Sequence, residues 1–272
     1  MNRNLPRLDQ ETSATAPDSN LPIAVRDRAA DGRVGWTGPL LLLAARPVLL
    51  VAAQALVALI LLERGQKTPW RAAGDWWGVY GNVADIGCLV LLRYFTRREG
   101  IRLRDLLGPV RMRRGHDLWL GVGCYLLIFP VFFLSTWLAK SLFFHADPAV
   151  AVGYLSRAHP LPLWATIYGL CVWWIVWTPT EEATYQAYAL PRIEALTRHR
   201  SMAVLLVGFC WAAQHCALPL ILDWRYLAFR LVSFFPGVLC LMVVYLRTRR
   251  LTPVIFAHWP MDIAAAIFHV IY

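Results

Sequence analysis

Long apolar runs separated by short polar segments make up most of the chain. Residues 118–139 and 160–180 contain no charged side chain, and residues 201–222 contain only His215. Each run is long enough to cross the ~30 Å hydrocarbon core of a bilayer as a helix. The pattern predicts an all-α fold, a polytopic transmembrane helical bundle of about seven spans, at residues 38–62, 76–93, 118–139, 162–190, 201–221, 227–246 and 251–271.

The same pattern divides the chain into three parts. Residues 1–35 are polar and contain prolines but no apolar run, which is typical of a disordered cytoplasmic tail. Residues 36–140 are expected to hold the N-terminal transmembrane helices, joined by a basic cytoplasmic loop. Residues 160–272 are expected to hold the remaining helices as a C-terminal transmembrane core.

Charge supports the membrane assignment and argues against a nucleic-acid partner. The net charge is +10, but 19 of the 27 Lys and Arg residues fall on one side of the membrane when the N-terminus is placed inside. This is the positive-inside pattern of membrane proteins. The apolar chain with short loops is typical of a bacterial inner (plasma) membrane protein. We therefore expect an integral membrane protein with a cytoplasmic N-terminus, in contact with the lipid bilayer and not with nucleic acid.

Five ionisable side chains interrupt the predicted spans. Glu181 and Glu182 lie in one span, His215 lies in the next, and His258 and Asp262 lie in the last. Such residues are costly in hydrocarbon and usually functional. Counted from the basic residue at the inner end of each span, Glu181, His215, His258 and Asp262 lie roughly 16, 22, 12 and 18 Å deep. These four residues are therefore expected to meet in the inner-to-middle part of the membrane.

Each group also has a simpler interpretation. The Glu pair could cap a helix start, His215 could be a hydrogen-bonded core residue, and His258 and Asp262, which share a face at i, i+4, could stabilise their helix. Glu181 and Glu182 are about 100° apart on an α-helix, so one is expected to face a cavity and the other to point elsewhere. The occurrence of all three groups at one depth favours a single site.

The order and spacing of these residues resemble a known family. The segments EEATYQ (181–186), WAAQH (211–215) and HWPMD (258–262) are similar to the Glu-Glu-x3-Arg, Phe-x3-His and His-x3-Asn/Asp motifs of the CPBP family. That family contains CAAX prenyl proteases of the Rce1 type and Abi-type proteins. The resemblance covers about residues 160–270 and identifies the C-terminal core as the catalytic part. Gln186 replaces the motif Arg, and Trp211 replaces Phe.

The resemblance implies an intramembrane endopeptidase that hydrolyses a peptide bond of a membrane-associated protein or peptide. Glu181 with His215 would activate a water, and His258 with Asp262 would stabilise the oxyanion or orient the substrate carbonyl. Both glutamate-type and metal-dependent mechanisms are compatible with the resemblance, so Glu181, His215 and His258 are a possible set of ligands for a divalent metal such as zinc. The substrate is expected to be a membrane-anchored peptide or protein, because prenylated proteins are not expected in bacteria.

Two other functions are compatible with the sequence. Gln186 in place of Arg suits a catalytically silent scaffold or immunity protein of the same fold. Intramembrane charges at Asp85 and Arg230 suit a proton-coupled transporter. Gln186 is expected to hydrogen-bond Glu182 at i, i+4, and Glu182 is expected to carry a proton or to pair with a basic group from another helix, with Arg230 as a candidate.

Overall fold

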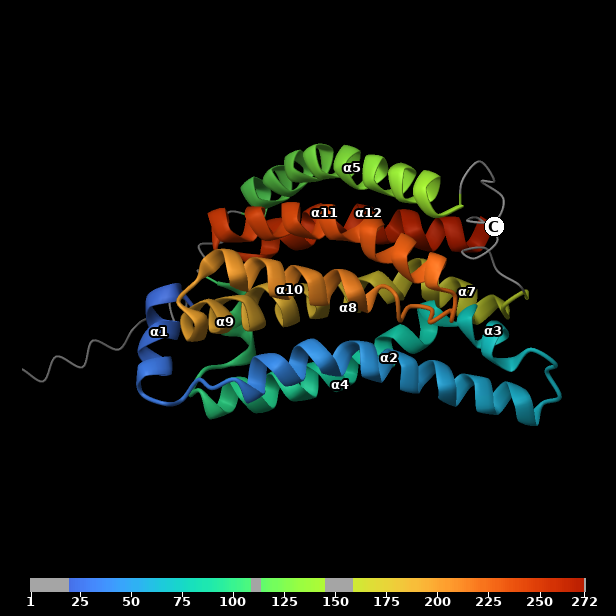
Figure 1. Cartoon of the computed structure of the whole chain (residues 1–272), viewed down its shortest axis with the longest axis horizontal. Coiled ribbons are helices and arrows are strands. Elements are labelled where there is room, and N and C mark those ends of the chain that lie inside the picture. Colours follow the sequence, from blue (N-terminus) through green and yellow to red (C-terminus); the bar gives the residue numbers. More distant parts are fainter. Residues whose placement is uncertain (1–19, 109–113, 145–158, 272) are drawn as a thin grey trace, which may run out of the picture.

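The computed structural model describes residues 20–108, 114–144 and 159–271 (Figure 1). The regular elements of these residues are all helical, which confirms the predicted all-α fold. In chain order they are α1 (Pro22–Ala30), α2 (Thr37–Glu63), α3 (Pro69–Gly74), α4 (Trp77–Arg98), the 3-10 turn η2 (Leu103–Leu107), α5 (Arg114–Phe144), α7 (Leu163–Tyr168), the π-helical η3 (Gly169–Trp173), α8 (Trp174–Glu182), the π-helical η4 (Ala183–Ala189), α9 (Leu190–Thr197), α10 (Arg200–Gln214), α11 (Trp224–Thr248) and α12 (Leu251–Ile271).

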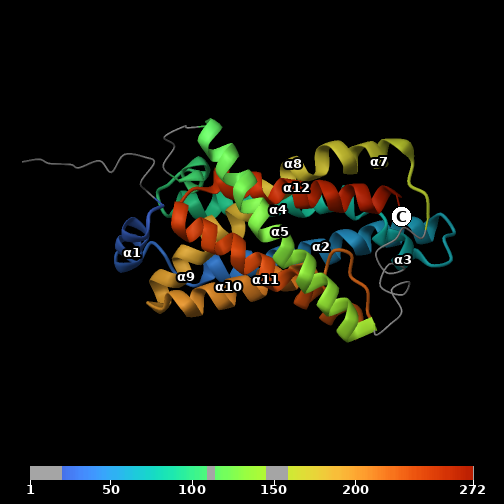
Figure 2. The ribbon, with the colours of Figure 1, turned by 90° about the horizontal axis from the view of Figure 1, so that it is seen from above.

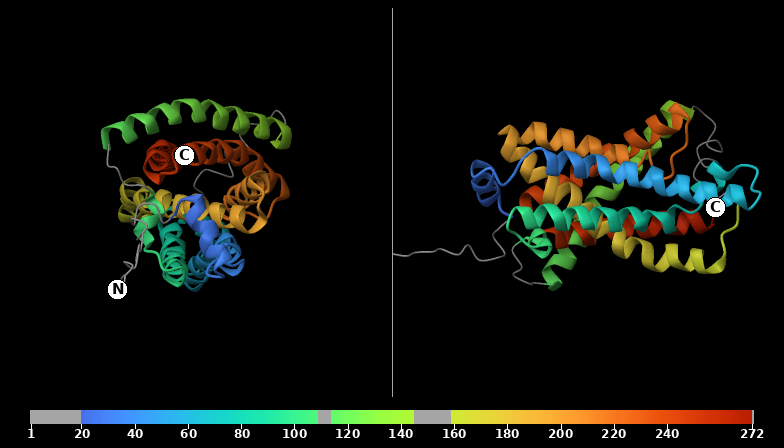
Figure 3. Two further views of the ribbon diagram at one scale, coloured as in Figure 1. Left: turned by 90° about the vertical axis from the view of Figure 1, so that its left-hand side faces the viewer. Right: turned by 90° about the horizontal axis from the view of Figure 1, so that it is seen from below.

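The long helices form an elongated bundle with their axes roughly along its length (Figure 1). α5 covers one face and packs on α11 and α12, whereas α2 and α4 pair on the opposite face. Seen from above, α5 crosses α12 obliquely (Figure 2). Seen from one end, α5 arches over the rest of the bundle (Figure 3). The segment from α8 to α9 lies between these layers, and each of its residues from Thr180 to Glu194 is buried.

The predicted spans correspond to helices of the structure. Four described helices are long and apolar enough to cross a membrane, and they coincide with the first, third, sixth and seventh predicted spans: Thr37–Glu63, Gly115–Phe144, Trp224–Thr248 and Leu251–Val270. The second predicted span is α4, which continues beyond residue 93 to Arg98. The fourth is a continuous helical path that runs from α7 to α9.

The fifth predicted span was wrong at its C-terminal end. We expected a helix over 201–221, but α10 ends at Gln214 and a non-helical loop follows. Side chains of other helices satisfy the backbone of that loop: Gln54 bonds both the N–H and the C=O of Leu220. Arg230 donates to the carbonyls of His215 and Leu218. Irregular backbone at membrane depth is tolerated where protein groups bond it in this way.

Two π-helical segments interrupt the fourth span. η3 lies before α8 and η4 lies directly after Glu182. Every residue of η4 is buried, as expected for a helix that is enclosed by other helices on all sides. π-helical widening inside an α-helix occurs frequently at functional sites.

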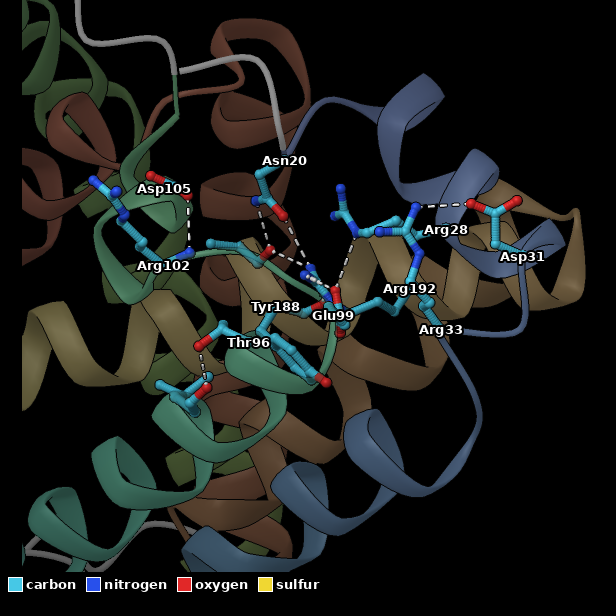
Figure 4. A network of polar contacts seen from close by, with 12 residues as sticks. Asn20, Arg28, Asp31, Arg33, Thr96, Glu99, Arg102, Asp105, Tyr188 and Arg192 are labelled. Atoms are coloured by element: carbon cyan, nitrogen blue, oxygen red, sulfur yellow. Dashed lines mark hydrogen bonds and ion pairs between the residues drawn. The ribbon is translucent and has the colours of Figure 1, made fainter. Parts of the chain in front are cut away.

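The prediction of a disordered tail over 1–35 was wrong for its second half, because α1 spans Pro22–Ala30. Residues 1–19 lie outside the described residues. Figure 4 shows the cause of this order, a buried polar network around Arg192. Arg192 pairs with both carboxylate oxygens of Glu99 (2.8 and 2.6 Å) and donates to Asn20 (3.0 Å), and Asn20 in turn donates to the carbonyl of Ala187 in η4 (2.8 Å). The N-terminal segment is therefore tied to the end of the central helix.

Candidate active site

The structure brings all five predicted site residues together. Glu181 and Glu182 are fully buried at the end of α8, and His215 follows the last residue of α10. His258 and Asp262 come from α12 and are also buried. Three segments that are far apart in the sequence thus bring three carboxylates and two imidazoles together inside the bundle.

Glu181 lies between the two imidazoles. Its Oε1 accepts a hydrogen bond from Gln214 Nε2 and lies 3.6 Å from His215 Nε2. Its Oε2 lies 3.8 Å from His258 Nε2 and has no hydrogen-bond partner among the described residues. One oxygen of this carboxylate is therefore fixed by an amide, while the other remains available to a reactant.

Glu182 has two direct partners. Its Oε1 lies 2.8 Å from His258 Nδ1, and its Oε2 accepts from Gln186 Nε2 at 2.5 Å. The expected bond with Gln186 is confirmed. The expectation that one Glu points away from the site was wrong, because the two ring nitrogens of His258 contact both carboxylates. The basic group from another helix that was expected to pair with Glu182 is His258 of α12, and the suggested candidate Arg230 was wrong, since it bonds backbone carbonyls instead.

Hydrogen bonds define which ring nitrogens carry protons. His215 Nδ1 lies 3.0 Å from the carbonyl oxygen of Trp211. A carbonyl can only accept, so this nitrogen carries the hydrogen, and in the neutral ring Nε2 presents a lone pair toward Glu181. The His215 ring also stacks on Phe234, with centroids 3.8 Å apart. These contacts fix both the orientation and the tautomer of His215.

Asp262 completes the site from α12. Its Oδ1 lies 3.6 Å from His258 Nε2, as expected for i, i+4 neighbours. Its Oδ2 accepts a hydrogen bond of 2.5 Å from the Thr178 hydroxyl of α8. Thr178 and Gln214 were not predicted from the sequence. Each is a polar residue in an apolar run and lies within three residues of a motif residue. This position next to a motif was the sequence feature that could have identified them as site residues.

The donor set also fits a divalent cation. Glu181, His258 and Asp262 each offer one ligand atom, and these atoms lie within 4.8 Å of one another. A carboxylate–imidazole–carboxylate set is suited to zinc, and the bond from His258 Nδ1 to Glu182 is the type of outer contact that orients metal-bound histidines. This set contains Asp262 where the sequence suggested His215.

One comparison with known proteins gave a match. Residues 162–264 match the family described as type II CAAX prenyl endopeptidase Rce1-like, and the matched stretch contains all five site residues. No curated protein and no solved structure gave a match. The chain is therefore an integral membrane protein whose residues 162–264 are similar to the type II CAAX prenyl endopeptidase Rce1-like family.

Proposed function

We propose that this protein is an intramembrane endopeptidase in which Glu181 activates the water that cleaves the substrate. The observation that carries the proposal is the environment of Glu181: a fully buried carboxylate, with Oε2 unpartnered among the described residues and with an imidazole Nε2 near each of its oxygens. Separations of 3.6 and 3.8 Å are too long for direct hydrogen bonds, but one water can bridge them.

In the proposed reaction Glu181 is the general base. It takes a proton from water while the water oxygen bonds to the carbonyl carbon of the scissile peptide. His258 is surrounded by three carboxylates, which favours its imidazolium form. In that form Nδ1 donates to Glu182, and Nε2 donates to the oxyanion that develops on the substrate. Glu181 then returns its proton to the leaving amine as the C–N bond breaks.

His215 and Asp262 have supporting roles in this mechanism. His215 directs the lone pair of Nε2 at the water beside Glu181. Asp262, held by Thr178, orients His258. If a divalent cation is bound, Glu181, His258 and Asp262 would hold it, and it would supply Lewis-acid polarisation of the carbonyl. Metal analysis of the purified protein by mass spectrometry tests this alternative: stoichiometric zinc that is lost in Asp262→Ala supports the metal-dependent form.

The proposed substrate is a membrane-anchored peptide or protein, cut near the cytoplasmic half of the membrane. The support is the distribution of basic residues, which favours a topology with the N-terminus and the segments 93–117, 191–200 and 247–250 in the cytoplasm. Glu181, the proposed base, is 10 residues from the segment 191–200, and His258 is 8 residues from the segment 247–250. This orientation gives the active site access from the inner leaflet.

Comparison of protein termini in membranes that contain the wild type or Glu181→Ala tests the proposed function. We expect a set of new termini in membrane proteins that appear with the wild type and are absent with Glu181→Ala. Identical termini in the two samples would reject endopeptidase activity.

A non-catalytic scaffold or immunity role is the second candidate, and Gln186 in place of the motif Arg favours it. It predicts that Glu181→Ala and His258→Ala both fully complement a deletion strain, whereas the endopeptidase predicts that neither does.

A further inference from the structure

A buried ion pair adjacent to the five-residue site joins α2 to α4. Arg46 Nη1 lies 2.6 Å from Asp85 Oδ1, and both side chains are fully buried. Arg46 Nε and Nη2 have no hydrogen-bond partner among the described residues. A guanidinium is costly inside an apolar bundle, and buried N–H groups without partners are rare. This arginine is therefore expected to have a function beyond its contact with Asp85.

The Arg46 guanidinium lies against the helix that carries the Glu pair. Its Cζ is 4.0 Å from the centroid of the Trp177 ring. Trp177 precedes Glu181 by four residues on α8, so the ring and the carboxylate share a helix face one turn apart. Gly81 of α4 provides the space for this ring, because a Cβ there would come within 3.2 Å of it. From this position Arg46 interacts electrostatically with Glu181 and with Asp262.

The charges of the site require such a cation. Glu181, Glu182 and Asp262 are three buried carboxylates at one point. The side chain at position 186, which bonds Glu182, is a neutral amide. Arg230 of α11 does not pair with these carboxylates, because it donates to the backbone carbonyls of His215 and Leu218 after the last residue of α10. Arg46 supplies a permanent positive charge on the α2 side of the Glu pair.

We propose that Arg46 is a positioning residue of the endopeptidase site, which supplies from α2 the fixed positive charge that position 186 lacks and holds Glu181 in its reactive placement. Asp85 fixes the guanidinium, and Trp177 provides the surface on which it stacks. This inference rests on the proposed function. It also accounts for Asp85, one of the two intramembrane charges that suited a proton-coupled transporter.

The test uses the full-length protein in liposomes and a synthetic peptide that spans the cleavage site most strongly lost in Glu181→Ala membranes. Arg46→Met/Asp85→Leu removes both charges together, so no unpaired buried charge remains. Gln186→Arg is then added to this double variant. The control is Arg250→Met/Asp117→Leu, which removes an ion pair of 2.7 Å that lies away from the site.

We expect kcat of the Arg46/Asp85 double variant to fall roughly tenfold or more, with KM changed by less than about threefold, because the lost interaction acts on the reacting carboxylate. Gln186→Arg should restore most of kcat, since it returns a cation to the site. The control double variant should keep wild-type kcat. Arg46→Lys, which keeps the charge, should retain at least about a third of kcat.

Several outcomes overturn the inference. They are wild-type kcat in the double variant, a loss that Gln186→Arg does not restore although the protein is folded, or a folded Arg46→Lys variant with kcat below about one tenth of wild type. If the double variant does not fold, the same kcat criteria are applied to two other variants, Arg46→Lys and Arg46→Lys/Gln186→Arg. Failure of the proposed function is recognised separately, because the wild type would then release no more product than Glu181→Ala.

Discussion

A single hydroxyl, that of Thr178, holds Asp262 against α8. The bond is 2.5 Å long, and Thr178 is fully buried. Thr178→Val keeps the volume of the side chain but removes the donor, which leaves Asp262 without this contact. We expect kcat/KM to fall about tenfold, a loss typical of a missing hydrogen bond to a buried charge. The measurement is peptide cleavage by purified protein in liposomes.

Thr180 provides a matched control for this prediction. It lies two residues further along α8 and is equally buried, but its hydroxyl donates to the carbonyl of Val176 in its own helix. Thr180→Val should therefore keep kcat/KM within about threefold of wild type. Equal losses in the two variants would show that packing, and not the bond to Asp262, is responsible.

Gln186 supplies the second residue-scale prediction. Its amide donates to Glu182, and Gln186→Leu would remove that bond inside the bundle. We expect Gln186→Leu to lower the free energy of unfolding by about 1–3 kcal/mol, whereas Gln186→Arg, which restores the family motif, should be tolerated. Thermal unfolding in detergent measures both variants. Wild-type stability and activity in Gln186→Leu would contradict this account of the motif.

The sequence allowed some of these contacts to be predicted and not others. The i, i+4 spacings placed Gln186 beside Glu182 and Asp262 beside His258, because helix geometry is local. The side chain of Glu182 points toward the site because it contacts the imidazole of His258, which comes from α12. The contact of Arg46 with Trp177 joins α2 to α8. Such contacts arise from tertiary packing, so single-chain periodicity does not contain them.

At the scale of the helices, Gly121 allows a close approach of α5 to α12. A Cβ at this position would lie 2.5 Å from Phe256 Cβ and 2.9 Å from the carbonyl oxygen of Pro253. Gly121→Ala therefore forces these two helices apart, and we expect it to lower the free energy of unfolding by about 1–3 kcal/mol. Because α12 carries His258 and Asp262, cleavage should fall as well.

Gly123 is the control for the helix contact, since a Cβ there meets nothing within 4 Å. Gly123→Ala should leave stability unchanged or raise it by up to about 1 kcal/mol, because alanine favours helix. Denaturation of both variants in the same detergent compares them directly. A Gly121→Ala variant as stable as Gly123→Ala would contradict the close approach of α5 to α12.

The ends of the helices were less predictable than their existence. The apolar run after His215 suggested a continued helix, but α10 stops where Gln54 of α2 and Arg230 of α11 bond the backbone of the following loop. The order of α1 likewise depends on Arg192, a residue distant in the sequence that is enclosed by Glu99 and Asn20. In both places the deciding partner comes from another element.

The distribution of basic residues predicts the orientation of the whole molecule in the membrane. The proposed topology places the segments 191–200 and 247–250 in the cytoplasm and residue 272 outside. Reporter fusions at these positions and within 93–117 measure the side of the membrane directly. Cytoplasmic signals for the three inner segments and an external signal at the C-terminus are expected, and an external signal within 93–117 would reverse both the topology and the depth of the site.

Peptide cleavage by the purified protein, with and without Glu181, tests the central claim most directly. The wild type in liposomes should cleave the membrane peptide identified from the terminal comparison, and Glu181→Ala should abolish cleavage while its thermal unfolding shows that it remains folded. His215→Ala should reduce the rate strongly, because the same water would lose a partner. Full wild-type cleavage by both Glu181→Ala and His215→Ala would contradict the assignment of this site as the active site of an endopeptidase.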